Sequence, residues 1–407
     1  PFRGSEEIPS LTHVIYLGPE PIDGTISYGD FLRMGESVSD TVLKNHCISV
    51  RPDDIFSIQY TSGTTGKPKG VMTSHAAYCI NGFAVAHRQN ITADDISCIP
   101  SPFFHAYGCI SVMAAICAGA AIAPVERYSP SLFLKTIETC RATMICGTPT
   151  MFFAALEELT HNTYDISSLR GGNMAGAPCP PDLVKHVCEK MDVPEFGVLY
   201  GATEIIVPIM NGATDSLIHR TETMGYALPD VSVRVVDPVL RHVCATGEPG
   251  ELLVRCPSVM KEYYKMPEMT REAIDSDGFY HTGDMVTIDQ DGYVSIAGRI
   301  KDMIIRGGEN LYPAEIESAI LTHPDVLEVQ VVGIPSDYYG EEVVAFVRLH
   351  PGSTIRPVEL KRYAREIMAI DKVPALFYVV ESFPLTASGK VQKFKLREYA
   401  LLKMKET

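Results

Sequence analysis

The sequence predicts an α/β fold of more than one domain, because of its length and because short apolar runs alternate with helical patterns. Its 407 residues exceed the size at which a single hydrophobic core stops growing. Before Met224, apolar runs of strand length are separated by helical periodicity, which is typical of helices layered on a mostly parallel sheet. Those runs lie at residues 12–17, 97–100, 143–147 and 195–199.

Two later changes of pattern divide the rest of the chain. Strands with turn signals predominate at 231–236, 250–254, 284–288 and 293–296, and they predict a β-rich subdomain. After Arg299, a helix that begins at Pro313 is followed by strand patterns at 326–334, 343–349 and 377–381, by a helix at 358–368 and by a basic helix from Val391. We therefore predict a large domain at 1–299 and a small α+β domain at 300–407.

Composition and charge narrow the class of protein. Apolar residues make up 46% and charged residues 21%, as in an ordinary globular protein. The formal net charge of −15 argues against nucleic acid or an anionic membrane as the main partner, since both favour Lys/Arg-rich surfaces. The eleven cysteines are scattered without a CxxC pair, which predicts reduced packing residues rather than a redox or metal centre.

An uncharged stretch at 96–125 is long enough to span a bilayer. Pro100, Pro102, Gly108, Gly119 and Pro124 interrupt it, so we predict instead a buried helix at 109–118 and a strand at 120–124, with no transmembrane segment. The chain opens on Pro1 and shows no leader pattern, and we expect it to be a fragment or a processed form.

The strongest local signal is a glycine-rich loop at residues 60–70. Glycines let several backbone N–H groups face one anion, while hydroxyls and lysines add donors and charge, so this loop predicts a phosphate cradle. A flexible linker is the alternative, which the lysines and the preceding apolar run at 55–58 disfavour. It is not a Walker A loop, since two residues separate its glycines and Pro68 follows the first lysine. The candidate binding residues are Thr61, Ser62, Gly63, Thr64, Thr65, Gly66, Lys67 and Lys69.

This loop resembles the signature of the adenylate-forming superfamily, which comprises acyl-CoA synthetases, luciferases and peptide-synthetase adenylation domains. The segments at 148–152, 303–310, 312–315 and 384–390 are most similar to the medium-chain acyl-CoA synthetase group of animals. The resemblance implies that a carboxylic (fatty) acid reacts with ATP to form an acyl adenylate, with Mg2+ as cofactor, and that the acyl group then passes to coenzyme A. It also implies a mitochondrial location, with a cytoplasmic one as the alternative, and a longer N-terminal portion than this chain has.

The segment at 200–204 resembles the family segment that binds adenine and metal. The resemblance implies that Tyr200 packs on adenine, that Thr203 touches the α-phosphate and that Glu204 holds the metal; Gly201 and Ala202 lie between them. A lone glutamate after a turn is otherwise a solvated surface residue. Upstream, Gly176 and Ala177 resemble the adenine wall.

Three further positions take nucleotide roles by resemblance. Asp284 would accept hydrogen bonds from both ribose hydroxyls, as one carboxylate can. Arg299 would reach the ribose or phosphates, a surface ion pair being its alternative. Lys390 would place an ammonium between the two reacting anions, whereas by itself it is one lysine of a basic tail.

In the second half reaction Lys390 would block the approach of the thiol, so it must move out of the site. The family moves this lysine by rotating its C-terminal domain. By resemblance, Lys301 is the hinge, and Gly307 and Gly308 then allow close approach of the pantetheine arm. A plain turn is the alternative for the two glycines. His105, in the apolar segment at 103–108, is either a gate of the acyl tunnel or a satisfied core histidine.

Two other functions stay open at this point. One is an adenylating enzyme that loads a different thiol acceptor, and the other is a truncated, non-catalytic nucleotide-binding chain. Neither a GxSxG elbow nor a GxGxxG fingerprint is present, so hydrolase and dehydrogenase functions have little support. The oligomeric state is not predicted.

Overall fold

The computed structural model describes residues 7–20, 22–61, 68–385 and 391–405. Two compact units divide the chain, Pro1–Asp54 and Ile55–Thr407. The first unit holds a parallel pair of two-residue strands and two helices, and none of its helical residues is buried. Serine side chains cap both helices. The elements are β1 (Ile15–Tyr16), β2 (Ile26–Ser27), α1 (Tyr28–Gly35) and α2 (Asp40–Ser49).

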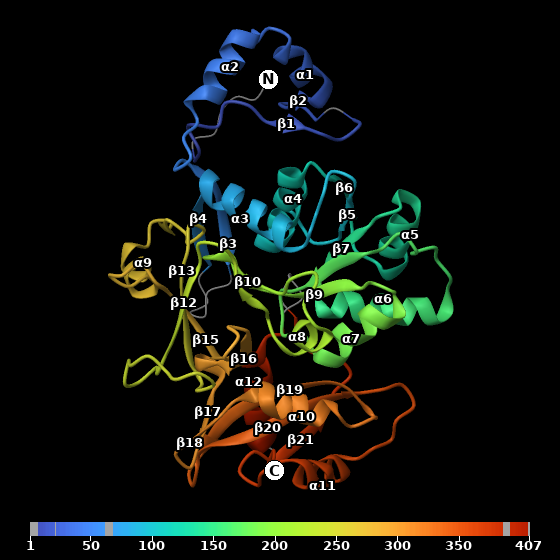
Figure 1. The fold of residues 1–407 in the computed structure, drawn as a ribbon, viewed down its shortest axis with the longest axis vertical. Coiled ribbons are helices and arrows are strands. Elements are labelled where there is room, and N and C mark those ends of the chain that lie inside the picture. Colours follow the sequence, from blue (N-terminus) through green and yellow to red (C-terminus); the bar gives the residue numbers. More distant parts are fainter. Residues whose placement is uncertain (1–6, 21, 62–67, 386–390, 406–407) are drawn as a thin grey trace. The chain divides into compact units, whose positions relative to one another are not determined.

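A seven-stranded sheet forms the centre of the second unit, with the strand order β11-β10-β9-β8-β7-β5-β6. The strands from β9 to β6 run parallel, and β10 and β11 continue the sheet antiparallel (Figure 1). Their bounds are β5 (Ile96–Ile99), β6 (Ala121–Pro124), β7 (Met144–Gly147), β8 (Gly171–Met174), β9 (Glu195–Ala202), β10 (Ile206–Met210) and β11 (Tyr226–Ala227).

Helices cover both faces of this sheet, because its parallel strands are apolar on both sides. Tyr78 and Ile110 pack against one face, whereas Phe133, Phe152 and Phe196 belong to the core on the other. The helices of the first face are α3 (His75–Arg88) and α4 (Ala106–Ala118); those of the second are α5 (Pro130–Cys140), α6 (Pro149–His161) and α7 (Pro181–Lys190), and the short α8 (Leu217–Glu222) lies beside α7.

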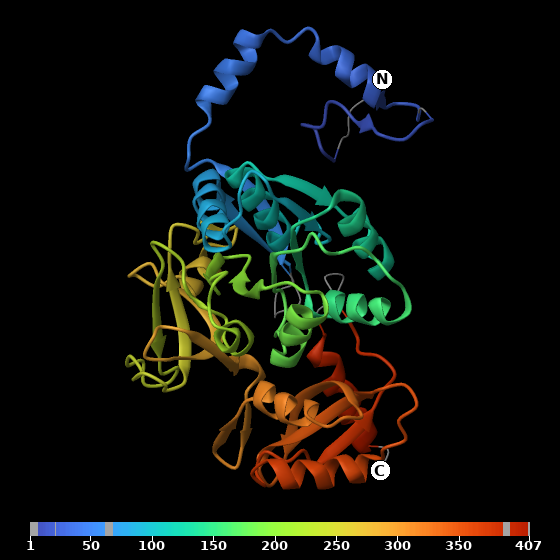
Figure 2. The ribbon, with the colours of Figure 1, turned by 45° about the vertical axis from the view of Figure 1, so that its right-hand side comes forward.

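Two antiparallel sheets form the β-rich region; in Figure 2 the strands β12 to β16 are yellow to orange, and β3 and β4 are blue. One has the order β12-β13-β15-β16, and the other has the order β14-β4-β3. The bounds are β3 (Ile55–Thr61), β4 (Lys69–Ser74), β12 (Ser232–Val236), β13 (Gly250–Arg255), β14 (Glu262–Tyr263), α9 (Pro267–Ala273), β15 (Tyr280–Ile288) and β16 (Val294–Arg299).

The C-terminal part has its own sheet, in the order β18-β17-β20-β19, with β21 beside β20. Helices α10 and α11 cover one face, whereas Leu396 and Ala400 of α12 pack on the other. The elements are η1 (Ile300–Asp302), β17 (Ile304–Arg306), β18 (Glu309–Leu311), α10 (Pro313–Leu321), β19 (Val326–Ser336), β20 (Gly340–Leu349), α11 (Pro357–Ile367), β21 (Leu376–Val379) and α12 (Lys393–Lys405).

The predicted α/β fold is confirmed. The uncharged stretch forms β5, α4 and β6, and α4 ends at Gly119, whose positive φ of 73° is the usual helix stop. Within the described ranges, every helix is too short or too polar to cross a membrane. The compact units divide after Asp54, and the predicted domain boundary after Arg299 stays a prediction.

A buried ion pair joins the amino ends of three parallel strands. Asp95, just before β5, accepts hydrogen bonds from Arg170, just before β8, and from Thr143, just before β7. Burial by itself raises the pKa of the Asp95 carboxyl, but these hydrogen bonds and the positive guanidinium outweigh it and hold that pKa well below its usual range.

Asp95→Asn should lower the free energy of unfolding by about 2 kcal/mol at pH 7, because a charged hydrogen-bond acceptor is lost. The pKa of an aspartate carboxyl is about 3.9 in the unfolded chain and lower for Asp95 in the folded protein. The stabilisation by charged Asp95 is therefore fully present above about pH 3.9 and is lost as the pH falls through the folded pKa. Urea unfolding from pH 7 to 2.5 measures it. The exposed neighbour Asp94→Asn is the control; an equal effect of both variants would contradict the assignment.

Candidate active site

The predicted site residues gather at one edge of the large sheet. His105 follows β5, Gly176 follows β8, and Thr203 and Glu204 follow β9. Because these three strands are parallel, their carboxyl ends lie at the same edge, where open α/β sheets bind ligands. Gly176 has a φ of +86°, a conformation that glycine adopts without strain.

A tight hairpin fixes the position of Glu204. β9 turns into β10 within three residues, and Ala202 pairs with Ile206, which has a positive φ of 55°. A Cβ atom on Gly201 would lie 1.9 Å from the carbonyl oxygen of Ile206, so only glycine fits there. This close approach holds Thr203 and Glu204 directly at the end of the sheet.

Glu204 is buried and belongs to a three-residue chain of polar contacts. The Tyr263 hydroxyl donates to Glu204 Oε1 at 2.8 Å and accepts from Lys69 Nζ at 2.8 Å. Lys69 Nζ lies 3.8 Å from the same carboxylate oxygen. Burial, and then the negative charge of Glu204, raise the pKa of Tyr263 well above its usual value, so this phenol stays protonated and keeps donating.

Lys69 begins β4, beside the glycine-rich segment. It pairs with Thr61, the last residue of β3, and residues 62–68 connect the two strands along the chain. The hydroxyl of Thr61 is buried and has no hydrogen-bond partner among the described residues. An unpaired buried donor costs free energy unless a ligand satisfies it, so Thr61 favours a polar ligand here.

Asp284, also buried, is the centre of a second charged group. Its Oδ2 accepts a hydrogen bond of 2.7 Å from the hydroxyl of Tyr200, near the end of β9. Its Oδ1 lies 2.8 Å from Arg299 Nε but accepts no hydrogen bond from any described residue. Burial and then the Asp284 charge raise the pKa of Tyr200 far above its ordinary value. Asp284 therefore presents one oxygen for a further donor.

The two charged groups are within electrostatic reach of each other. Burial raises the pKa of Tyr280, and the negative charges of Glu204 and Asp284 add to this effect. Burial also lowers the pKa of Lys301, to which the positive charges of Arg299 and Lys69 contribute. Cations of both groups thus act on the same side chain, and such a concentration of positive charge suits a polyanionic ligand.

Two other predicted groups have simple local contacts. His105 is the N-cap of α4, and its Nδ1 accepts a hydrogen bond of 3.2 Å from the Tyr107 amide. Gly307 and Gly308 form the exposed turn between β17 and β18, with φ values of 61° and 90°. The capping contact favours a structural part for His105; the gate and the acceptor-loop roles stay predictions.

The remaining predictions are incompletely tested. Lys390 and six residues of the loop, Ser62, Gly63, Thr64, Thr65, Gly66 and Lys67, lie outside the described residues. Ala177 is exposed beyond Gly176, and Ala202 ends β9. The roles given to all these residues stay predictions.

Sequence reasoning missed Tyr263, which bridges Lys69 and Glu204. It lies 194 residues from the one and 59 from the other, in a two-residue strand without a motif of its own. The charges of Glu204 and Asp284 both raise the pKa of Tyr280, and this proximity depends on how the two sheets pack. No local pattern reports such contacts.

One group of possible metal ligands lies elsewhere, in the connection from β12 to β13. Ligand atoms of His242, Cys244 and Glu248 lie within 4.8 Å of one another. Burial and nearby carboxylates raise the pKa of Cys244, which disfavours the thiolate that a metal requires. We therefore assign this trio no metal.

The fold and the site together define an adenylate-forming enzyme. The profile of the AMP-binding enzyme family matches residues 7–264, and that of the AMP-binding enzyme C-terminal domain matches residues 315–390. The chain therefore belongs to the AMP-binding enzyme family.

Its relatives place the chain among the acid–thiol ligases of that family. The putative acyl-CoA synthetase YngI of Bacillus subtilis is 44% identical over 97% of this chain and 72% of its own length. The mitochondrial medium-chain acyl-CoA ligase ACSF2 of Danio rerio is 38% identical over 97% of this chain and 66% of its own length. The chain thus spans about two thirds of the length of such ligases.

Solved structures agree with this placement. ATP-bound MatB from Rhodopseudomonas palustris has a TM-score of 0.80 and 33% identity, over 86% of this chain and 69% of that protein. The o-succinylbenzoate coenzyme A synthetase MenE of Bacillus subtilis, in complex with AMP, has a TM-score of 0.76 and 31% identity, over 86% and 70%.

Tyr263→Phe should destabilise the protein by about 1–2 kcal/mol, because Glu204 and Lys69 both lose a buried hydrogen-bond partner. The neighbouring Tyr264 is partly exposed, and Tyr264→Phe should change the stability by less than about 0.5 kcal/mol. Chemical denaturation of both variants measures the difference. Equal stabilities would show that the bridging hydroxyl contributes nothing.

Proposed function

We propose that this protein is an ATP-dependent acyl-CoA synthetase acting on medium-chain fatty acids through an acyl adenylate. The observation that carries the proposal is the pair of buried charged groups at the carboxyl edge of the sheet, centred on Glu204 and on Asp284. Both carboxylates are flanked by cations, Lys69 and Arg299 respectively. Membership of the AMP-binding enzyme family supports the same reaction.

Adenylation requires two anions to meet. A carboxylate is a poor electrophile because its leaving group would be oxide. When a carboxylate oxygen attacks the α-phosphorus of ATP, the acyl group is joined to AMP, which is a good leaving group. Lys69 and Arg299 offset the charge of the phosphates, and Thr61 offers its unpaired hydroxyl as a donor. Pyrophosphate leaves in this step.

Glu204 suits a magnesium ion. A carboxylate oxygen is the ligand type that Mg2+ prefers. One cation, the Lys69 ammonium, already lies 3.8 Å from Glu204 Oε1. When bound, Mg2+ neutralises phosphate charge during the transfer. Tyr263 keeps the carboxylate oriented by donating to Oε1.

The second group suits the nucleoside. Asp284 Oδ1, buried and without a hydrogen-bond donor among the described residues, is placed to accept from a ribose hydroxyl. Tyr200 stays protonated and fixes the other oxygen. By family resemblance, Tyr200, Gly176 and Ala177 also flank the adenine, and Thr203 contacts the α-phosphate.

Transfer to coenzyme A completes the proposed reaction. Lys390 supplies the ammonium that offsets repulsion in the first step. Rotation about Lys301 then exchanges it for the turn at Gly307 and Gly308. Beside that turn the thiol attacks the acyl carbonyl, the bond between the acyl group and AMP breaks, and AMP leaves as the thioester forms. Relatives described as acyl-CoA synthetases support coenzyme A as acceptor.

The medium-chain substrate rests on the ACSF2 relatives, which are described as medium-chain ligases. The mitochondrial location stays a prediction, since the relatives include both mitochondrial ligases and a bacterial protein.

Pyrophosphate exchange with acids from acetate to palmitate tests the proposal. We expect acid-dependent exchange with an optimum at medium chain length, and a decrease of about 100-fold in Lys390→Ala, because an ammonium that stabilises the transition state is lost. Lys395→Ala, from the exposed basic face of α12, is the control. Equal exchange in wild type and Lys390→Ala would refute the role of Lys390, and the absence of coenzyme A consumption would favour another acceptor.

Glu204→Gln should raise the Mg2+ concentration for half-maximal exchange by about tenfold, because an amide is a weaker ligand than a carboxylate. The measurement is a Mg2+ titration at saturating ATP and acid. Glu262→Gln changes an exposed glutamate of β14 and should leave the titration unchanged. A midpoint in Glu204→Gln equal to that of wild type would exclude Glu204 as a metal ligand.

A further inference from the structure

Asp284 pairs with Arg299 of β16 on one side of β15, but on the other side, toward β13, the pairing is irregular. Glu251 pairs with Met285 and Leu253 pairs with His281, so one residue of β13 faces three of β15. The three are Thr282, Gly283 and Asp284, and Gly283 has a positive φ of 68°. A bulge of this kind leaves backbone groups without ladder partners.

Side-chain contacts replace the missing ladder bonds. The Gly283 amide donates to Glu251 Oε1 at 3.3 Å. The Thr282 hydroxyl donates to the Leu252 carbonyl at 2.8 Å and accepts from the Asp284 amide at 3.0 Å. Both residues that precede Asp284 are therefore fixed to β13.

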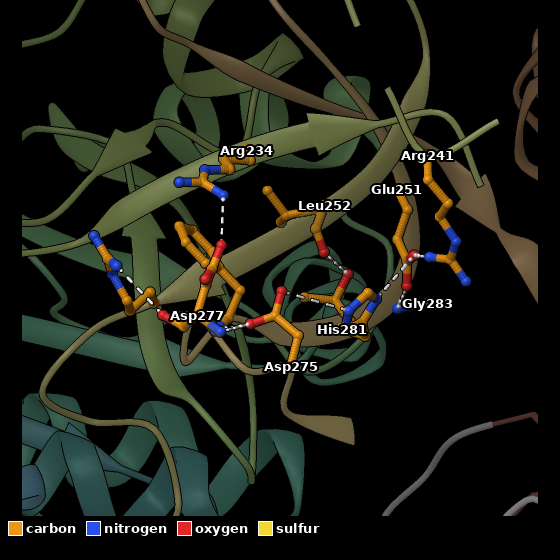
Figure 3. Close-up of polar contacts among 11 residues, drawn as sticks. Arg234, Arg241, Glu251, Leu252, Asp275, Asp277, His281 and Gly283 are labelled. Carbon is orange, nitrogen blue, oxygen red and sulfur yellow. Dashed lines mark hydrogen bonds and ion pairs between the residues drawn. The ribbon is translucent and has the colours of Figure 1, made fainter. Parts of the chain in front are cut away.

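Glu251 is a buried carboxylate with no described contact in the nucleotide site (Figure 3). Its Oε2 lies 3.2 Å from His281 Nδ1 and accepts from Arg241 at 3.3 Å. His281 Nε2 in turn faces Asp275 at 3.9 Å. Burying a charge costs free energy unless it is paired, and these contacts hold Glu251 at the bulge, with one oxygen left for the Gly283 amide.

We infer that Glu251 is a positioning residue for the nucleotide ribose, acting through the Gly283 amide on the orientation of Asp284. The inference rests on the proposed function, in which Asp284 accepts from the ribose hydroxyls. Glu251 itself touches no substrate. Its effect therefore lies in how well the protein distinguishes a ribose from a sugar that has no hydroxyls.

The test compares ATP with 2′,3′-dideoxy-ATP. In wild type we expect kcat/KM in pyrophosphate exchange to favour ATP by about tenfold or more, since hydrogen bonds to a charged acceptor are lost with the hydroxyls. Calorimetric binding of AMP and 2′,3′-dideoxy-AMP gives the same preference without turnover.

Two variants separate the length of the Glu251 side chain from its charge. Glu251→Asp keeps the charge but is one methylene too short for the Gly283 amide, and the preference should fall by about threefold or more. Glu251→Gln loses the charge but keeps an acceptor at the same reach, and most of the preference should remain. Glu248→Asp shortens a half-exposed glutamate in the connection between β12 and β13 and should have no effect.

The outcomes are distinct. Loss of preference in Glu251→Asp, with most of it retained in Glu251→Gln, supports the inference, and equal loss in both variants overturns the part given to the reach of the acceptor. An unchanged preference in Glu251→Asp also overturns the inference; if the affinity for both nucleotides falls equally, the role of Glu251 is structural only. Asp284→Asn is the reference: if it keeps the wild-type preference, or if wild type has none, the proposed ribose role of Asp284 fails and the inference fails with it. Thermal unfolding confirms that each variant is folded.

Discussion

The architecture of the site depends on burying two carboxylates beside cations and hydrogen-bond donors. Burying a charged group costs free energy unless an opposite charge or a hydrogen bond compensates it. Here Glu204 has Lys69 and Tyr263, and Asp284 has Arg299 and Tyr200. In both cases the phenol donates and the basic group supplies the opposite charge, so the same arrangement occurs twice at one edge of the sheet.

Each partner comes from a different part of the chain, which explains why the surrounding fold is needed. Glu204 and Tyr200 belong to the large sheet, Lys69 and Tyr263 to the three-stranded sheet, and Asp284 to the four-stranded one. The backbone departs from regular pairing at the turn that contains Gly201 and at the bulge that contains Gly283, and each lies within three residues before one of the carboxylates. Close backbone approach therefore determines where the charge lies.

Much of the fold was predictable from local pattern. The apolar run at 97–100 is β5 within one residue, and the helix expected after Pro313 is α10. Motif residues were equally accessible, since Glu204 and Asp284 lie in recognisable segments. Tyr263 and Glu251 were not, because their partners are distant in sequence or depend on a shift of register that periodicity does not encode. Buried contacts between sheets are set by packing, and a single sequence carries no direct record of them.

Asp284 pairs across the ladder with Arg299, the last residue of β16, after which the chain passes into η1. If Asp284 binds the ribose as proposed, a sugar hydroxyl on its Oδ1 competes with this guanidinium for the same atom. The proposed function then couples nucleotide occupancy to the freedom of the backbone at position 300: whatever loosens the strand end changes nucleotide affinity, and the nucleotide changes the strand end by the same factor.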